Sequence, residues 1–260
     1  MPDTLPMDYK DSDQPSLYVV GIGPGSSDLL PSMAIAALNR SKTIVGYSRY
    51  IELLPPNLTR GKNILSLGMR KEKDRCCLAI ESALNGSPTS IISSGDAGIY
   101  AMAGLIIELL EQKDLISKLN LAIIPGIPAL CAAAALLGAP LMHDFAVISL
   151  SDLLTPWSKI KDRLAKAAQA DFVLVIYNPK SKGRPDYLKE ALKIISQFRE
   201  PSCPVGIVRN AYRSNQWRKI ATINDFDPNL ADMLSLIIVG NSETRQVSQY
   251  MLTPRGYRLD

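Results

Sequence analysis

The sequence is poor in the residues that usually build protein metal sites. It holds a single histidine, His143, and four cysteines, none of them in a C-x-x-C pair. Structural zinc is bound by four closely spaced Cys or His ligands, so we expect no such site and no resident metal. The lone histidine is more typical of a structural residue than of a catalytic one.

A signal peptide is also missing from the sequence. Residues 1–16 carry several aspartates and prolines but no basic start followed by an apolar stretch. The adjacent Cys76 and Cys77 cannot easily bridge each other. We therefore expect free thiols in the reducing cytoplasm.

Long apolar runs and a strong charge of either sign are absent as well. The Ala-rich stretch 128–141 comes nearest to a membrane span and is too short for one. The formal net charge is +4, which is too small to indicate a nucleic-acid partner. A small polyanionic substrate would suit this charge if the cations cluster. The 260 residues suffice for one large domain or two modest ones.

The pattern that is present alternates short apolar runs with amphipathic stretches. Strands are expected at 17–20, 43–46, 64–67, 89–93 and 121–124, with helices at 31–39, 70–84, 98–112 and up to 137. Beyond 138–140 the pattern restarts, with strands at 145–150, 172–177, 205–209 and 234–239, helices at 157–168 and 187–198, and an extra antiparallel strand at 217–222. This alternation predicts an α/β fold, with a mainly parallel sheet formed by the first five strands. We predict a flexible tail at 1–16, an N-terminal α/β domain at 17–138, a C-terminal α/β domain at 143–250 and a tail at 251–260.

The loop G-I-G-P-G-S at 21–26 suggests a dinucleotide fold but does not fit one. The fingerprint G-x-G-x-x-G needs glycine where Ser26 stands, and Pro24 removes a backbone N–H that a pyrophosphate would use. An acidic residue should end the next strand, where Gly46 and Tyr47 stand. NAD is therefore disfavoured. Close backbone approach to another ligand and a tight turn without a ligand both stay open.

Two further strand ends of the first domain carry small residues. Asp96, in S-S-G-D-A-G-I-Y at 93–100, is placed either to accept hydrogen bonds from ribose hydroxyls or to cap the following helix. The segment P-G-I-P-A at 125–129 is either a wall for an adenine or a proline-rich helix start. Open α/β sheets bind ligands at the carboxyl ends of their strands.

The second predicted domain also carries polar residues at the ends of its strands. Polar loops follow its strands at 177–184 and 209–213. Cations in such loops either pair with substrate anions or are merely solvated. Asp152 either orients a substrate nitrogen or handles a proton, or it caps the helix at Trp157. Convergence of these loops with those of the first domain predicts a cleft between the domains.

Taken in order, these segments resemble the tetrapyrrole methylase family. The matching segments are G-I-G-P-G-S-S-D-L-L at 21–30, G-D-A-G-I-Y at 95–100, I-P-G-I-P-A at 124–129 and Y-N-P at 177–179. Within the family, the segments 95–104, 143–157 and 177–184 are most similar to the branch that methylates C-17 of precorrin-3-type tetrapyrroles. Uroporphyrinogen-type members usually show G-D-P where this sequence has G-D-A at 95–97, which favours the C-17 branch.

The resemblance implies a two-domain fold with S-adenosylmethionine in the cleft between the domains, a homodimer, and methyl transfer coupled to ring contraction in cobalamin biosynthesis. By matching position it implies cofactor contacts at Gly95, Asp96, Ile99, Pro128, Ala129, Tyr177, Asn178 and Ala211. It implies that Pro24 borders the substrate.

Several basic side chains are available for the acetate and propionate groups of a tetrapyrrole: Arg49, Arg70, Lys71, Lys73, Arg75, Lys180, Lys182, Arg184 and Arg213. Among them, Lys180, Arg184 and Arg213 are our candidate substrate-binding residues. Asp152 is our candidate catalytic residue.

Three alternatives stay open beside this interpretation. The first keeps the fold and changes the acceptor, either to another corrin position or to a different molecule. The second is a nucleotide-binding protein without turnover, and the third is the disfavoured NAD-dependent oxidoreductase. The motifs do not decide whether the substrate bears cobalt.

Overall fold

The computed structural model describes residues 15–181 and 183–258, and the chain divides into two compact units between Ala129 and Leu130. Nearly all of the predicted N-terminal tail lies outside the described residues, and Ser16 already begins the first strand. Among the described residues, no helix is both long and apolar enough to cross a bilayer.

Unit 1 is built on a five-stranded sheet in the order β3-β2-β4-β1-β5, in which every neighbouring pair is parallel. The strands are β1 Ser16–Gly21, β2 Thr43–Tyr47, β3 Asn63–Leu67, β4 Thr89–Ser93 and β5 Asn120–Ile124. The helices are α1 Ser32–Arg40, α2 Ser48–Ile51, α3 Pro56–Thr59, α4 Glu72–Leu84 and α5 Ala103–Gln112. The predicted parallel sheet is confirmed for this unit.

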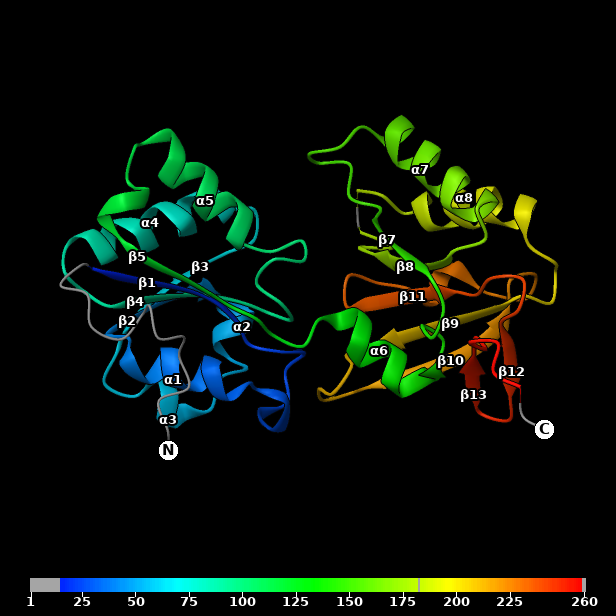
Figure 1. The fold of residues 1–260 in the computed structure, drawn as a ribbon, viewed down its shortest axis with the longest axis horizontal. Coiled ribbons are helices and arrows are strands. Elements are labelled where there is room, and N and C mark those ends of the chain that lie inside the picture. The colour runs from blue at the N-terminus through cyan, green and yellow to red at the C-terminus, as the bar shows by residue number, and fades with distance from the viewer. Residues whose placement is uncertain (1–14, 182, 259–260) are drawn as a thin grey trace. The chain divides into compact units, whose positions relative to one another are not determined.

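Helices cover both faces of this sheet (Figure 1), and the strands β1, β2 and β4 are buried on both sides. Val19 and Ile91 pack with α4 and α5 on one face, whereas Val20 and Ile92 pack with α1 and α3 on the other. Both faces being buried leaves the edges of the sheet for function, and the carboxyl edge carries the predicted loops.

Unit 2 contains a mixed sheet in the order β10-β9-β11-β8-β7. Its strands are β7 Phe145–Ser149, β8 Val173–Tyr177, β9 Pro204–Arg209, β10 Trp217–Thr222 and β11 Ser235–Val239. The β7–β8 pair is parallel and the other three pairs are antiparallel, so the mainly parallel arrangement of unit 1 is not repeated here. The predicted extra antiparallel strand at 217–222 is confirmed as β10.

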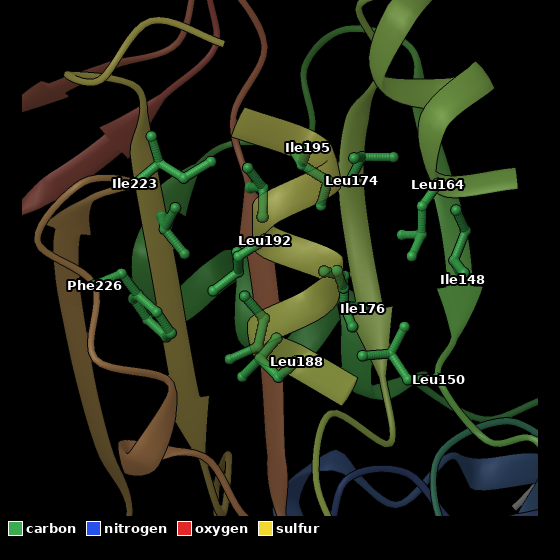
Figure 2. Close-up of a cluster of buried hydrophobic side chains, with 14 of the residues drawn as sticks. Ile148, Leu150, Leu164, Leu174, Ile176, Leu188, Leu192, Ile195, Ile223 and Phe226 are labelled. Atoms are coloured by element: carbon green, nitrogen blue, oxygen red, sulfur yellow. The ribbon is translucent and has the colours of Figure 1, made fainter. Parts of the chain in front are cut away.

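Two amphipathic helices, α7 Trp157–Gln169 and α8 Tyr187–Ile195, cover one face of the mixed sheet. Figure 2 shows Leu188, Leu192 and Ile195 of α8 pointing toward Leu174 and Ile176 of β8. These side chains are nearly or fully buried. The core thus fixes the start of α8, where residues of the candidate site lie.

The opposite face of the sheet is covered by α6 Ala129–Leu137, where a Cβ on Gly206 of β9 would lie 2.5 Å from the Leu137 side chain. A small sheet follows, with β6 Gly138–Ala139 parallel to β13 Tyr250–Leu252, and β13 antiparallel to β12 Arg245–Val247. Short 3-10 turns complete the chain at Ser27–Leu29, Ile116–Lys118, Ser196–Phe198 and Pro228–Leu230.

This packing places the boundary between the units earlier than the predicted 138–143. The helix α6 belongs with the second sheet, and the apparent linker Gly138–Ala139 is a strand. The predicted C-terminal tail also begins too early, because Thr253 is fully buried and donates to the Pro140 carbonyl at 2.7 Å.

Candidate active site

Three loops of unit 1 lie side by side at the carboxyl edge, because β4, β1 and β5 are neighbours in the sheet. The loop after β1 is hydrogen-bonded to the loop after β4 in both directions. The Gly23 N–H donates to the Gly95 carbonyl at 3.0 Å, and the Gly95 N–H donates to the Gly23 carbonyl at 2.7 Å. The two loops are therefore one continuous backbone surface.

The glycines at this edge allow the backbones of neighbouring loops to come into close contact. A Cβ on Gly126 would lie 2.0 Å from the Gly95 carbonyl oxygen and 2.7 Å from the Gly21 carbonyl carbon. A Cβ on Gly21 would lie 2.7 Å from the Gly126 nitrogen. Backbone thus fills the crevice in which doubly wound sheets hold a dinucleotide pyrophosphate. The first glycine loop is thus packed against its neighbours through backbone. Close approach of this loop to a ligand stays a prediction.

Asp96 holds two of these loops together. Its Oδ1 accepts from the Gly98 N–H at 2.7 Å and its Oδ2 accepts from the Gly126 N–H at 3.0 Å. The alternative helix-capping role is wrong, because α5 begins at Ala103 and not at the predicted residue 98. Residues between Asp96 and α5 form an irregular loop. The carboxylate stays half-buried, so its free lone pairs still face the edge.

The structure brings the predicted cofactor residues of unit 1 close together. A Cβ on Gly95 would lie 3.5 Å from the Ala129 nitrogen and 3.6 Å from the Pro128 Cα. Ile99 is 36% exposed on the loop after Asp96. Pro24 is buried in the neighbouring loop after β1. An apolar side chain, backbone groups and one carboxylate are therefore presented on one edge.

Unit 2 presents a second set of loops at one edge. The strands β8 and β9 are both antiparallel to β11, and β7 is parallel to β8, so all three strands end on the same side. Asn178 and Asn210 directly follow β8 and β9 with left-handed φ values of 51° and 52°. Tyr212 also has a positive φ of 56°, which is rare for a bulky residue. Backbone strain of this kind gathers at functional sites.

Hydrogen bonds fix the predicted cofactor residues of unit 2. The Asn178 Nδ2 donates to Ser149 Oγ at 2.9 Å, which ties the ends of β7 and β8 together. The Tyr177 hydroxyl accepts from the Leu130 N–H at 3.0 Å and so satisfies a free donor in the first turn of α6. Ala211 follows Asn210 and is half-buried.

Asp152 is engaged by two side chains in the structure. Its Oδ2 accepts from the Tyr187 hydroxyl at 2.7 Å, and its Oδ1 lies 3.6 Å from the Arg184 Nε. The hydrogen bond to Asp152 raises the pKa of Tyr187 above its ordinary value. The alternative cap role is wrong, since Pro156 precedes α7 and makes no side-chain cap. A proton-handling role for Asp152 stays a prediction.

The candidate substrate-binding cations differ in how much their donors are used. Arg184 is only 10% exposed at its side chain and donates to the Leu150 carbonyl at 2.6 Å and to Ser181 Oγ at 3.2 Å. Lys180 is less committed, with one bond of 3.1 Å to Asn229. Arg213 is half-buried in the loop after β9.

Four further basic residues of the prediction differ in their surroundings. Arg75 is 7% exposed at its side chain and is bound to the Gly68 carbonyl at 2.7 Å and to Glu72 at 3.0 Å, so it is structural. Lys182 lies outside the described residues. Arg70 and Lys71 are exposed in the loop that precedes α4.

Sequence reasoning missed several residues that hold the site in place. Arg209 ends β9 and donates from Nε to Asp232 at 2.7 Å, which pins the loop that carries Asn210. Burial raises the pKa of Asp232, but the hydrogen bonds from Arg209, the Leu234 N–H and Ser235, with the Arg209 charge, together outweigh burial and hold the pKa below its ordinary value. Tyr187 and Ser149 were missed as well. No motif marks such residues, because their partners lie far away in sequence.

The amino edge of unit 1 has a depression of its own. A depression in unit 1, lined by Lys42, Asn63 and Glu81, lies at the amino edge and contains none of the predicted residues. Within the described part of the chain, no three His, Cys, Asp or Glu residues gather closely enough to hold a metal ion.

Known proteins are similar to this chain in fold and in sequence. Residues 16–227 match the family described as Tetrapyrrole (Corrin/Porphyrin) Methylases. The chain is 46% identical over 243 residues to the probable cobalt-factor III C(17)-methyltransferase of Salmonella typhimurium strain LT2, covering 94% of this chain and 100% of that protein. It is 38% identical over 248 residues to the precorrin-3B C(17)-methyltransferase of a Sinorhizobium species, covering 93% and 97%.

Among solved structures, the crystal structure of the methyltransferase CobJ matches with a TM-score of 0.88 at 38% identity, covering 92% of this chain and 99% of that one. The family match spans most of both units and includes the loops that form the two carboxyl edges. The chain therefore belongs to the tetrapyrrole (corrin/porphyrin) methylases.

Proposed function

We propose that this protein transfers a methyl group from S-adenosylmethionine to C-17 of a precorrin-3-type tetrapyrrole, with contraction of the macrocycle, in cobalamin biosynthesis. The observation that carries the proposal is its full-length similarity to a cobalt-factor III C(17)-methyltransferase, at 46% identity. The loops at the two carboxyl edges support it, because they contain the residues that the family resemblance assigns to the cofactor.

The residues at these edges are suited to S-adenosylmethionine. Asp96 offers carboxylate lone pairs beside small residues, and Ile99 offers an exposed apolar surface. In unit 2, Asn178 and Asn210 hold backbone with left-handed φ values at the ends of β8 and β9. We assign the cofactor to Gly95, Asp96, Ile99, Pro128, Ala129, Tyr177, Asn178 and Ala211. The expected cleft between the two units stays a prediction.

S-adenosylmethionine supplies a methyl group on a sulfonium, which is already an activated leaving group. The protein therefore contributes chiefly by holding donor and acceptor in line, which is worth up to about 7–11 kcal/mol in well-oriented reactions. The hydrogen bonds between Gly23 and Gly95 and between Asp96 and Gly126 make the unit 1 loops rigid enough for this task. No covalent nucleophile is required from the chain.

For the acceptor, we propose the cobalt-bearing form. The similarity to the Salmonella cobalt-factor III protein, at 46%, exceeds that to the Sinorhizobium precorrin-3B protein, at 38%. Lys180 is better placed for the substrate carboxylates than Arg184, which is largely used within the protein. Arg213 stays a candidate by its position in the loop after β9. Pro24 would border the substrate from unit 1.

Asp152 is our candidate for proton handling during the reaction. A group that moves a proton in the transition state typically contributes about 10²–10⁴-fold to the rate. The Asp152→Asn variant should then lose at least about 10²-fold in kcat while its affinity for the acceptor is unchanged. An unchanged kcat in a folded variant would reject this role and leave Asp152 as a residue that positions its loop.

We also propose a homodimer in the cytoplasm, as the resemblance implies. The protein's mass in solution, measured by light scattering with and without S-adenosylhomocysteine, tests the dimer.

The activity itself is tested by incubating the protein anaerobically with S-adenosylmethionine and either cobalt-factor III or precorrin-3B. Gain of one methyl group at C-17 supports the proposal. Methylation elsewhere on the ring, or of neither compound despite cofactor binding, would favour another acceptor in the same family. Failure to bind S-adenosylhomocysteine would instead favour a protein without this activity.

A further inference from the structure

The segment that connects β7 to α7 exposes two adjacent leucines. Leu153 is 67% exposed and Leu154 is 98% exposed. Figure 1 shows the connection as a loop that projects from the end of β7 before the chain turns into α7. Single exposed apolar side chains are common on protein surfaces, whereas two adjacent ones form a small apolar patch that calls for a reason. We call the loop that carries them, residues 151–156, the tip.

The tip is held on both sides by the same residue. On the N-terminal side, Asp152 accepts a hydrogen bond of 2.7 Å from the Tyr187 hydroxyl. On the C-terminal side, the Trp157 ring stacks on the Tyr187 ring, with centroids 4.0 Å apart and planes 14° apart. Tyr187 opens α8, whose other face is buried in the core of unit 2. The leucines are therefore carried on a rigid base.

A largely buried guanidinium strengthens the same base. Arg184, 10% exposed at its side chain, donates to the Leu150 carbonyl at 2.6 Å and lies 3.6 Å from Asp152. The Leu150 N–H also donates to the Tyr177 carbonyl at 3.0 Å. Burying a cation is costly unless its donors are used. The pair of a largely buried guanidinium and a partly exposed carboxylate thus helps to hold the base of the loop that carries the exposed leucines.

The tip is continuous with residues assigned to the cofactor. Ser149 ends β7 just before the loop, and its Oγ accepts from Asn178, which follows β8. Leu150 is bonded to Tyr177, the last residue of β8. The tip therefore lies on the same carboxyl edge as the unit 2 cofactor residues, where the molecule that accepts the methyl group must also come.

We propose that Leu153 and Leu154 form an apolar contact for the face of the tetrapyrrole macrocycle and thereby help to select a flat, apolar-faced acceptor. This inference rests on the proposed function. A tetrapyrrole combines a broad apolar face with a rim of carboxylates. The exposed leucines match the face, and Lys180 on the neighbouring loop is available for the rim. A rigid tip loses little conformational entropy when it binds such a face.

The test compares binding of cobalt-factor III, followed by quenching of tryptophan fluorescence, with binding of S-adenosylhomocysteine. The Leu153→Ser and Leu154→Ser double variant should bind cobalt-factor III at least about tenfold more weakly, because two leucines lose their apolar contact. Its affinity for S-adenosylhomocysteine should be unchanged. The Leu153→Met and Leu154→Met double variant, which keeps an apolar tip, should bind cobalt-factor III as the wild type does.

A matched control uses another exposed apolar residue. Ile116 is 51% exposed and lies before β5, at the opposite edge of unit 1. Ile116→Ser should leave both affinities unchanged. Wild-type affinity for cobalt-factor III in the double serine variant would overturn the inference. Were its mass in solution also to fall, the tip would be a contact between two copies of the chain. A wild-type protein that binds S-adenosylhomocysteine but neither cobalt-factor III nor precorrin-3B would overturn the proposed function, and the inference with it.

Discussion

The substitution Gly126→Ala probes the contact that joins the three loops of unit 1. The new Cβ would lie 2.0 Å from the Gly95 carbonyl oxygen and 2.7 Å from the Gly21 carbonyl carbon. Both neighbours are backbone, so no side-chain rotation relieves the overlap and the loops must separate. Overpacking typically costs 1–3 kcal/mol, and this geometry belongs at the upper end, about 3 kcal/mol. Separation would also stretch the 3.0 Å bond from the Gly126 N–H to Asp96.

The expected result is a loss of both stability and cofactor affinity. A destabilisation of about 3 kcal/mol lowers Tm by roughly 6–12 °C for a protein of this size, as measured by circular dichroism. The affinity for S-adenosylhomocysteine, measured by calorimetry, should fall at least about tenfold, because Gly95 and Asp96 move with the loop.

A matched glycine provides the control. Gly104 lies in α5, and a Cβ added there meets nothing within 4 Å. Gly104→Ala should therefore stabilise the protein by about 0.5–1 kcal/mol through helix propensity, with unchanged affinity for S-adenosylhomocysteine. If Gly126→Ala instead keeps the wild-type Tm and affinity, the loops are not packed as tightly as we argue.

Three other outcomes are expected. Ser93 Oγ is buried without a hydrogen-bond partner among the described residues, so Ser93→Ala should leave Tm unchanged or raise it slightly; a clear fall would mean that the hydroxyl holds a water or ligand. The pKa of Asp232 is lowered in the folded protein, so its charged form stabilises the fold above the unfolded pKa of about 3.9, and this stabilisation is lost as pH falls. Asp232→Asn should therefore have a lower Tm than the wild type at pH 7 and the same Tm in acid. A Tm difference that persists in acid would refute the pairing with Arg209. Burial raises the pKa of the Cys76 thiol to about 12 and that of Cys203 to about 11, so neither should react with iodoacetamide at pH 8 before unfolding, as mass spectrometry can check.

Much of the secondary structure follows from local pattern. Short apolar runs bounded by glycine and proline located the main strands, and β4 was predicted at the observed residues, Thr89–Ser93. Strand direction in unit 2 did not follow, because an apolar run reads the same whether its neighbour is parallel or antiparallel. The short strands β6, β12 and β13 were missed because two or three residues are too few to show a hydrophobic period.

The boundary between the units could not be predicted from local sequence pattern either. Gly138 and Ala139 have the composition of a linker, yet they pair with β13, which lies more than one hundred residues later in the chain. The mainly Ala and Leu sequence of α6 would pack against either sheet. Tertiary contacts such as those of Leu137 with Gly206 and of Leu130 with Tyr177 place it in unit 2.

For the candidate site, the sequence identified segments better than roles. The residues Gly95, Asp96, Pro128 and Ala129 do come together, as the loops at neighbouring strand ends predicted. The function of Asp96 in bridging two loops could not be foreseen, because it depends on an N–H thirty residues away. Asp152 likewise has a partner, Tyr187, that no local spacing reveals.

The most direct test of the central claim is the position of the methyl group in the product. The purified protein is incubated anaerobically with S-adenosylmethionine carrying a labelled methyl group and with cobalt-factor III, and the product is mapped by mass spectrometry and NMR. Our account predicts one labelled methyl group at C-17 of a contracted ring. A label at any other carbon, or none in a protein that binds S-adenosylhomocysteine, would contradict it.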